Sequence, residues 1–383
     1  MPATPIVVTM DADADPVGAA MFAKVFLELG VEATLMVSGP TAKSLAADHP
    51  LTDVLKRLDA GLVDRELDEP KASTPRLFGP RFESLHDPLL FVAGRLPTVY
   101  GCPGFAHGAY ATLSEVNIRA VLPAEPIAPT KNAFFLGGRL HLPPAIPVKR
   151  LTSDADVESV FHRVTTEVDH DDTSAPVVIG LHGTATAVSE SALGALLRRL
   201  KEPTSFAVCS VRQAADLFAD IPYDHAIPIS AITAMAADAA KGDLACHQYA
   251  LGYLSPAEQL FILTHCWAAS LEKGKPPRNS QTRTPIPTLD DPAVSTATTI
   301  SAAELPSLIA KLKAAMEGKN ELPAAIELEA GVVAAQDLLP TLAASLSSMP
   351  TPTDLAVVKG AAMFAPEAVG FGRLAWTYKP ATQ

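Results

Sequence analysis

Three aspartates follow a short apolar segment near the start of the chain. Asp11, Asp13 and Asp15 stand at every second position after residues 5–10, PIVVTM. An apolar segment of this length, bounded by polar residues, predicts a buried strand with carboxylates at its carboxyl end. Carboxylates there can act as general bases or bind a divalent cation. Asp15 directly precedes Pro16 and a segment of helical spacing, so we expect it to cap a helix.

A second apolar segment ends in a histidine. Residues 175–181, APVVIGL, predict another buried strand, and His182 follows it. The carboxyl ends of parallel strands meet at one edge of a sheet, so we expect His182 to lie near Asp11 and Asp13. A carboxylate and an imidazole at one edge can serve as general base and general acid, or contribute to a metal site. A structural role for this histidine fits the position equally well.

The elements that must position these residues alternate in type along the first 220 residues. Apolar strand-like segments alternate with segments whose apolar residues recur at helical spacing, which predicts an α/β fold with a parallel sheet, open or closed into a barrel. The predicted strands are 5–10, 32–38, 97–101, 120–123, 140–143, 175–181 and 205–209, and the predicted helices are 16–29, 108–117, 155–168, 190–202 and 211–220.

From residue 221 the composition changes to Ala-rich helical segments separated by Pro-rich connectors. Residues 244–268 align without a gap over residues 322–346, and a helical segment ending near a glycine precedes each. We therefore expect residues 221–383 to form a mainly helical accessory module with two copies of one motif, near 231–271 and 305–349. Such paired copies normally pack on each other, which favours a binding, scaffold or dimerisation role.

Composition limits the class of partner. The chain of 383 residues has a net charge of −12 and no basic cluster, which argues against nucleic acid and anionic membranes as partners. No apolar segment approaches the length of a membrane span. The four cysteines are too scattered to predict a disulfide framework, and no secretory signal is evident, so we expect a cytoplasmic protein. A small or sugar-like molecule is the expected partner, with a homodimer or other homo-oligomer formed through the helical module.

Several motifs in residues 5–220 resemble the polysaccharide deacetylase superfamily, which includes carbohydrate esterase family 4 and other proteins with NodB homology. VVTMDADADP is similar to the family motif T-F-D-D-G-P, and FLELGVEATLMVSG, residues 26–39, is similar to L-x-x-x-G-I-x-A-T-F-F-V-x-G. VVIGLHG, residues 177–183, resembles the late motif ending in L-H. The resemblance implies a distorted (β/α) barrel, with Asp11 as general base and His182 as general acid.

The segment around YGCPG resembles the part of the family that lines the substrate groove. The resemblance implies that substrate contacts come from Tyr100, Cys102, Pro103, Gly104 and His107. The implied reaction is hydrolysis of a C–N (amide) or ester bond in a small or sugar-like substrate.

The family's metal site is altered in this chain. The two imidazole positions of its H-x-x-x-H motif fall on Pro70 and Thr74 within residues 65–75, and its second aspartate falls on Ala12. Asp13 could replace that aspartate, and His86 or His107 could enter from a loop. A divalent, zinc-like metal therefore stays open as a cofactor, and no other cofactor is expected.

Three functions are consistent with these observations. The barrel could be a deacetylase-like hydrolase that uses the Asp11 and His182 pair, with Asp13 as auxiliary carboxylate or metal ligand. It could instead be a catalytically silent, ligand-binding barrel with the helical module as scaffold or dimer contact. A lyase or isomerase could use the same pair for proton transfer.

Overall fold

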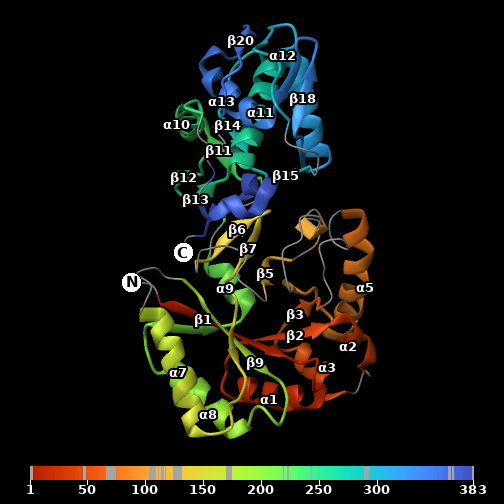
Figure 1. Cartoon of the computed structure of the whole chain (residues 1–383), viewed down its shortest axis with the longest axis vertical. Coiled ribbons are helices and arrows are strands. Elements are labelled where there is room, and N and C mark those ends of the chain that lie inside the picture. The colour runs from red at the N-terminus through yellow and green to blue at the C-terminus, as the bar shows by residue number, and fades with distance from the viewer. Residues whose placement is uncertain are drawn as a thin grey trace. The chain divides into compact units, whose positions relative to one another are not determined.

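The computed structural model of the chain consists of two compact units (Figure 1). Unit 1 contains residues 1–134, 139–218 and 383, and unit 2 contains residues 135–138 and 219–382. The structure describes residues 3–45, 49–65, 75–102, 109–110, 112–113, 116, 118–123, 132–169, 175–218, 220–221, 224–242, 244–288, 293–360, 364 and 366–381.

Unit 1 contains a curled, half-barrel sheet of parallel strands with helices packed around it. Within the unit the strand order is β7-β5-β4-β3-β2-β1-β9-β8, and β10 also pairs with β1. The α/β class predicted from the sequence is therefore confirmed. The strands are β1 (Thr4–Asp11), β2 (Thr34–Ser38), β3 (Asp59–Val63), β4 (Val99–Cys102), β5 (Ala120–Pro123), β7 (Arg139–His141), β8 (Ile146–Val148), β9 (Val177–His182) and β10 (Phe206–Cys209), while β6 (Phe134–Leu136) begins in unit 1 and continues in unit 2.

The helices of unit 1 follow the expected alternation in the first and last thirds of the unit. They are α1 (Pro16–Glu28), α2 (Gly39–Ser44), α3 (Pro50–Leu55), α5 (Pro75–Ala93), α7 (Asp154–Asp169), α8 (Glu190–Lys201) and α9 (Val211–Leu217). The long helix α5 and the strand β3 were not predicted, because charged and proline residues interrupt the apolar pattern of residues 50–93. Of the predicted helix at 108–117, residues 109–110 and 112–113 are helical, while 108, 111, 114, 115 and 117, like residues 103–107 before it, lie outside the described part of the chain.

β1 occupies the centre of the sheet. Residues Pro5–Met10 are buried, and the strand pairs with β10 through its first half, with β2 through its last three residues, and with β9 along most of its length. Helix α1 begins directly after this strand, and Asp15 is its N-cap, accepting a hydrogen bond from the backbone N–H of Gly18 at 2.8 Å. The predicted cap is thus confirmed, and it leaves Asp11 and Asp13 free of a capping role.

Unit 2 contains two segments with the same order of elements. In the first, β11 (Ala226–Pro228), α10 (Ile229–Ala239), the hairpin of β12 (His247–Tyr249) and β13 (Gly252–Leu254), α11 (Pro256–Lys273) and β14 (Asn279–Gln281) follow one another, and β11 pairs antiparallel with β14. In the second, β16 (Thr299–Ile300), α12 (Leu305–Lys313), the hairpin of β18 (Ala325–Leu328) and β19 (Gly331–Ala334), α13 (Ala335–Ala344) and β20 (Leu355–Ala356) repeat that order, and β16 pairs antiparallel with β20.

The two segments share one apolar core built on Trp267 and the facing sides of α11, α12 and α13. A π-helix, η1 (Ala314–Gly318), and a short parallel pair, β15 (Ile286–Pro287) and β17 (Glu321–Leu322), join them. The chain closes with the 3₁₀ turn η2 (Leu346–Ser348), the 3₁₀ helix η3 (Pro366–Thr377) and β21 (Lys379–Pro380). Among the described residues no helix combines the length and apolarity needed to cross a bilayer.

Candidate functional site

Asp11 and His182 are the last residues of two neighbouring parallel strands. They are direct partners in the register of β1 with β9, and the backbone N–H of Gly183 donates to the carbonyl of Asp11 at 2.9 Å. A side chain at Gly183 would bring its Cβ to 2.5 Å from that carbonyl, so only glycine allows this close approach. Both Asp11 and His182 line one cavity of about 410 Å³ at the carboxyl edge of the sheet.

Arg65 joins the two aspartates at this edge. It follows β3, and its guanidinium contacts Asp11 (Nη2 to Oδ2, 2.6 Å) and Asp13 (Nε to Oδ2, 2.9 Å). Backbone donors fix the remaining oxygens: the N–H of Asp13 donates to Asp11 Oδ1 at 3.0 Å, and the N–H of Ser38 donates to Asp13 Oδ1 at 2.8 Å. The two carboxylates therefore share one cation in a defined orientation.

The Arg65 side chain is 50% exposed and lines the cavity together with Asp11 and His182. Partial burial alone would lower the pKa of Arg65, but the hydrogen bonds and negative charges of Asp13 and Asp11 outweigh it and raise that pKa above its ordinary value. The guanidinium is consequently a permanent positive charge at the mouth of the cavity.

The described residues do not fit a zinc-like metal centre. They contain no group of three or more His, Cys, Asp and Glu side chains arranged to hold a metal ion. Asp11 Oδ2 and Asp13 Oδ2 both contact the Arg65 guanidinium, so each carboxylate already has a cation as partner. His86, a possible additional ligand, lies on α5, contacts Asp87 and stacks on Phe82. His107, Pro70 and Thr74 lie outside the described residues.

Asp64 and Tyr100 form a second polar layer beside the cavity. Asp64 is buried, its N–H donates to the carbonyl of Gly101 at 2.9 Å, and its Oδ2 accepts from the Tyr100 hydroxyl at 3.3 Å. Asp64, Gly101 and Cys102 line the cavity, whereas Tyr100 is not among its described lining residues and contacts Asp64 through its hydroxyl. Of the predicted substrate contacts, Pro103, Gly104 and His107 lie outside the described residues.

Sequence reasoning missed Asp64 and Arg65. Asp11 and His182 end their strands, and Asp64 and Arg65 directly follow β3, so the same rule of polar residues at the end of a short apolar segment applies to GLVDRE, residues 61–66. The resemblance to the H-x-x-x-H motif concerns the histidine positions of residues 65–75, and it gives no role to the charge of Arg65 at the first of them.

Comparisons with known proteins give structural similarities and no match to a family model or a curated protein. Among solved structures, a protein described as a polysaccharide deacetylase from Mycobacterium smegmatis is similar with a TM-score of 0.44 and 14% identity, covering 56% of this chain and 90% of that one. A family 4 acetyl xylan esterase from Clostridium thermocellum, with a cobalt ion, has a TM-score of 0.38 and 14% identity, covering 56% of this chain and 91% of that one.

A mutant of a CE4 family pseudoenzyme is also similar, with a TM-score of 0.38 and 11% identity over 56% of this chain and 68% of that one. The residues of the site itself carry the functional argument.

Proposed function

We propose that unit 1 binds a small, sugar-like ligand in the cavity at the carboxyl edge of its sheet, without a resident metal. The observation that carries this proposal is the Arg65 guanidinium held between Asp11 and Asp13. In the family that the sequence resembles, the first aspartate of the motif, at Asp11 here, is the general base, and the second, at Ala12 here, is a metal ligand. Here a cation of the chain itself neutralises Asp11 and Asp13, so the edge is preorganised for binding.

The chemistry of the cavity suits a polyhydroxylated ligand. Carboxylate oxygens of Asp11 accept hydrogen bonds, the Arg65 guanidinium donates them, and a sugar hydroxyl can do both. Met36, Leu122 and Leu181 add apolar wall area for the carbon faces of a ring. Two carboxylates against one guanidinium leave no net positive charge among these three groups, which disfavours an anionic ligand.

Acid–base hydrolysis of a C–N or ester bond is the second candidate function. It is favoured by the register of Asp11 directly beside His182, with both side chains on one cavity. Each oxygen of Asp11 accepts one hydrogen bond from Arg65 or Asp13 and retains a second accepting position. The carboxylate therefore has the capacity to take a proton from a bound water, and the imidazole of His182 to supply one to a leaving group. A lyase or isomerase reaction would use the same two transfers.

The test is a titration of the full chain with a panel of short oligosaccharides, in acetylated and unacetylated forms, by calorimetry or ligand-detected NMR. We expect saturable binding by the wild-type chain. Arg65→Met and Asp11→Asn should each raise the dissociation constant by about tenfold or more, because each removes one charge-assisted contact with the ligand. Arg150→Met is the matched control, because Arg150 is 74% exposed and pairs at the surface with Asp156. Binding unaffected by both site variants would contradict the proposal.

Two further measurements separate the candidates. Release of acetate or amine by the wild-type chain, abolished by Asp11→Asn and by His182→Gln, would establish the hydrolytic function. Elemental analysis after purification in zinc-containing buffer is expected to give no stoichiometric metal. A stoichiometric metal that is lost in Asp13→Ala would overturn the metal-free reading.

A further inference from the structure

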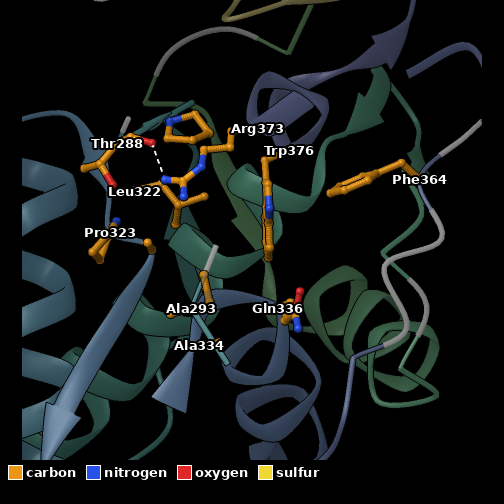
Figure 2. Close-up of a pocket in the computed structure, with 12 residues that line it drawn as sticks. Thr288, Ala293, Leu322, Pro323, Ala334, Gln336, Phe364, Arg373 and Trp376 are labelled. Carbon is orange, nitrogen blue, oxygen red and sulfur yellow. Dashed lines mark hydrogen bonds between the residues drawn. The ribbon is translucent and has the colours of Figure 1, made fainter. Parts of the chain in front are cut away.

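Unit 2 contains a cavity of about 280 Å³ with a composition unlike that of the unit 1 site (Figure 2). Its walls come from β15, β17, β19, the first turn of α13 and η3, and most lining residues are alanine, proline, leucine or aromatic. Three of the described lining side chains are polar, Thr288, Gln336 and Arg373, and none of the described lining residues is acidic. The described part of the lining therefore combines an apolar body with one cation, Arg373.

One wall of the cavity is aromatic. Trp376 and Phe364 both line it, with ring centroids 6.1 Å apart in an edge-on arrangement at 70°. Leu322, Ala293 and Ala334 supply further apolar lining, as Figure 2 shows. A flat or branched hydrocarbon group is the kind of ligand part that such a lining desolvates favourably.

Arg373 presents a donor that the described residues leave unused. It precedes Trp376 by three positions in η3, and in a 3₁₀ helix residues so spaced lie on the same side. Its Nη1 donates to the Thr288 carbonyl at 2.8 Å, whereas its Nη2 is buried and has no hydrogen-bond partner within the described part of the chain. The Thr288 hydroxyl is likewise buried without a partner there.

The Arg373 Nη2 and the Thr288 hydroxyl are two polar groups without hydrogen-bond partners at one cavity, and a ligand could supply the missing partners. A buried donor without a partner destabilises a folded protein, and does so more strongly when the donor is charged. Within the described residues no ion pair neutralises Arg373, although the whole chain has a net charge of −12. A carboxylate matches the fork of a guanidinium, and its second oxygen can accept from a neighbouring hydroxyl.

We propose that this cavity binds a small organic carboxylate with an apolar, flat or branched body. The carboxylate contacts Arg373 and the Thr288 hydroxyl, and the body packs against Trp376. Small rotations of the guanidinium and of the Thr288 side chain are needed, since neither Nη2 of Arg373 nor the Thr288 hydroxyl has contact with solvent. A free carboxylic acid and the C-terminal residue of a peptide share this chemistry, and the experiment separates them. The proposal concerns unit 2 and does not depend on the ligand of unit 1.

The experiment uses the intrinsic fluorescence of the full chain. Both tryptophans of the protein, Trp267 and Trp376, belong to unit 2, and Trp267 is fully buried in its core. Titration with benzoate is expected to change the emission saturably, while benzamide, which has the same shape without the charge, binds at least about tenfold more weakly. A peptide ending in phenylalanine, with a free or an amidated terminus, shows which source of carboxylate the cavity prefers.

Variants of Arg373 complete the test. Arg373→Met is expected to lose the preference for benzoate over benzamide, and Arg373→Lys to retain part of it, with far-UV circular dichroism confirming that each variant is folded. Arg278→Met, at an exposed position of the same unit, is the matched control and keeps the preference. Equal binding of benzoate and benzamide by the wild-type chain, or no saturable binding of either benzoate or the free-terminus peptide, would overturn the proposal without any variant.

Discussion

Each unit places one cation between two carboxylates, and the two clusters differ in their access to water. In unit 1, Arg65 joins Asp11 and Asp13 and its side chain is 50% exposed. In unit 2, Lys379 joins Glu258 and Asp220, and its side chain is 1% exposed. The same charges therefore stand in two dielectric settings, one at the mouth of a cavity and one inside a core.

The buried cluster of Lys379, Glu258 and Asp220 is also hydrogen-bonded to the start of α11. Lys379 Nζ lies 2.7 Å from Glu258 Oε1, and Glu258 also accepts from the Ser255 N–H at 2.7 Å in the capping box of α11. Burial alone would lower the pKa of Lys379, but the charges of Glu258 and Asp220 outweigh it and raise that pKa above its ordinary value. Burial raises the pKa of Asp220, although Lys379 acts in the opposite direction.

The comparison teaches that charge composition alone does not distinguish a structural cluster from a ligand site. Removing one partner of a buried pair leaves an uncompensated charge in a low-dielectric core, whereas solvent replaces the partner of an exposed one. The Lys379 cluster consequently anchors the end of the chain to α11, and the Arg65 cluster retains groups that a ligand can reach.

The largest expected effect is on the buried cluster. Lys379→Met should lower the free energy of unfolding of unit 2 by about 3–5 kcal/mol, because Glu258 and Asp220 lose their common cation. This loss can be measured by urea unfolding with tryptophan fluorescence as the signal, since both tryptophans lie in unit 2. Lys241→Met, which breaks an exposed pair with Asp238, is the control and should cost no more than about 1 kcal/mol. Equal losses in the two variants would break the comparison.

The second largest effect is expected at a histidine that burial keeps neutral, His141. His141 is fully buried in unit 1, its Nε2 lies 2.7 Å from the Tyr110 hydroxyl, and burial lowers its pKa from 6.5 to about 3. In the unfolded chain His141 is protonated below about pH 6.5, whereas in the folded chain it stays neutral down to about pH 3. The free energy of unfolding therefore falls as the pH drops from 6.5 toward 3.

Between pH 6.5 and pH 5 this loss should reach about 2 kcal/mol. Hydrogen exchange of peptides from β1 and β9, corrected for the intrinsic pH dependence, measures it in unit 1. In His141→Gln this titration is absent. The free energy of unfolding should therefore depend less steeply on pH, whatever the absolute stability of the variant. An unchanged slope in that variant would show that other groups cause the acid sensitivity.

The third aspartate after β1 gives a smaller, local effect. Asp15→Ala should destabilise unit 1 by about 1 kcal/mol, because the Gly18 N–H loses its acceptor at the start of α1. Asp15→Asn keeps an oxygen acceptor and should cost less. Hydrogen exchange in the first turns of α1 reports on both variants, and equal exchange in Asp15→Ala and the wild type would show that the cap contributes nothing.

The smallest effect on stability is expected at the exposed cluster. Arg65→Met should change the free energy of unfolding of unit 1 by no more than about 1 kcal/mol, measured by the same hydrogen-exchange method.

Substitution of Arg65 should instead alter the binding of cations at this cluster. Arg65→His places an imidazole beside Asp11 and Asp13, and calorimetry should detect zinc binding that the wild type and Arg65→Met lack or show far more weakly. A loss of stability as large as that of Lys379→Met would place the Arg65 cluster among the structural ones.

Much of the fold of unit 1 was predictable because its strands are short apolar segments and its helices have clear periodicity. β1, β2, β9, β10 and the helices α1, α7 and α8 lie close to their predicted positions. Prediction failed for residues 50–93, where β3 and α5 occur, since long-range packing there overrides a weak local pattern. Asp11 and His182 were found because each ends an apolar strand.

The sequence by itself determined that Asp11 and His182 stand at the ends of two strands and that Asp15 caps α1, because both follow from local periodicity and local hydrogen bonding. Only the tertiary structure decided that Arg65 meets Asp11 and Asp13, since β3 and β1 are far apart in the sequence and are brought near each other through β2. It also decided that Lys379 is buried while Arg65 is half exposed. Burial is a property of the packed chain, and it sets which charges are structural and which remain accessible to a ligand.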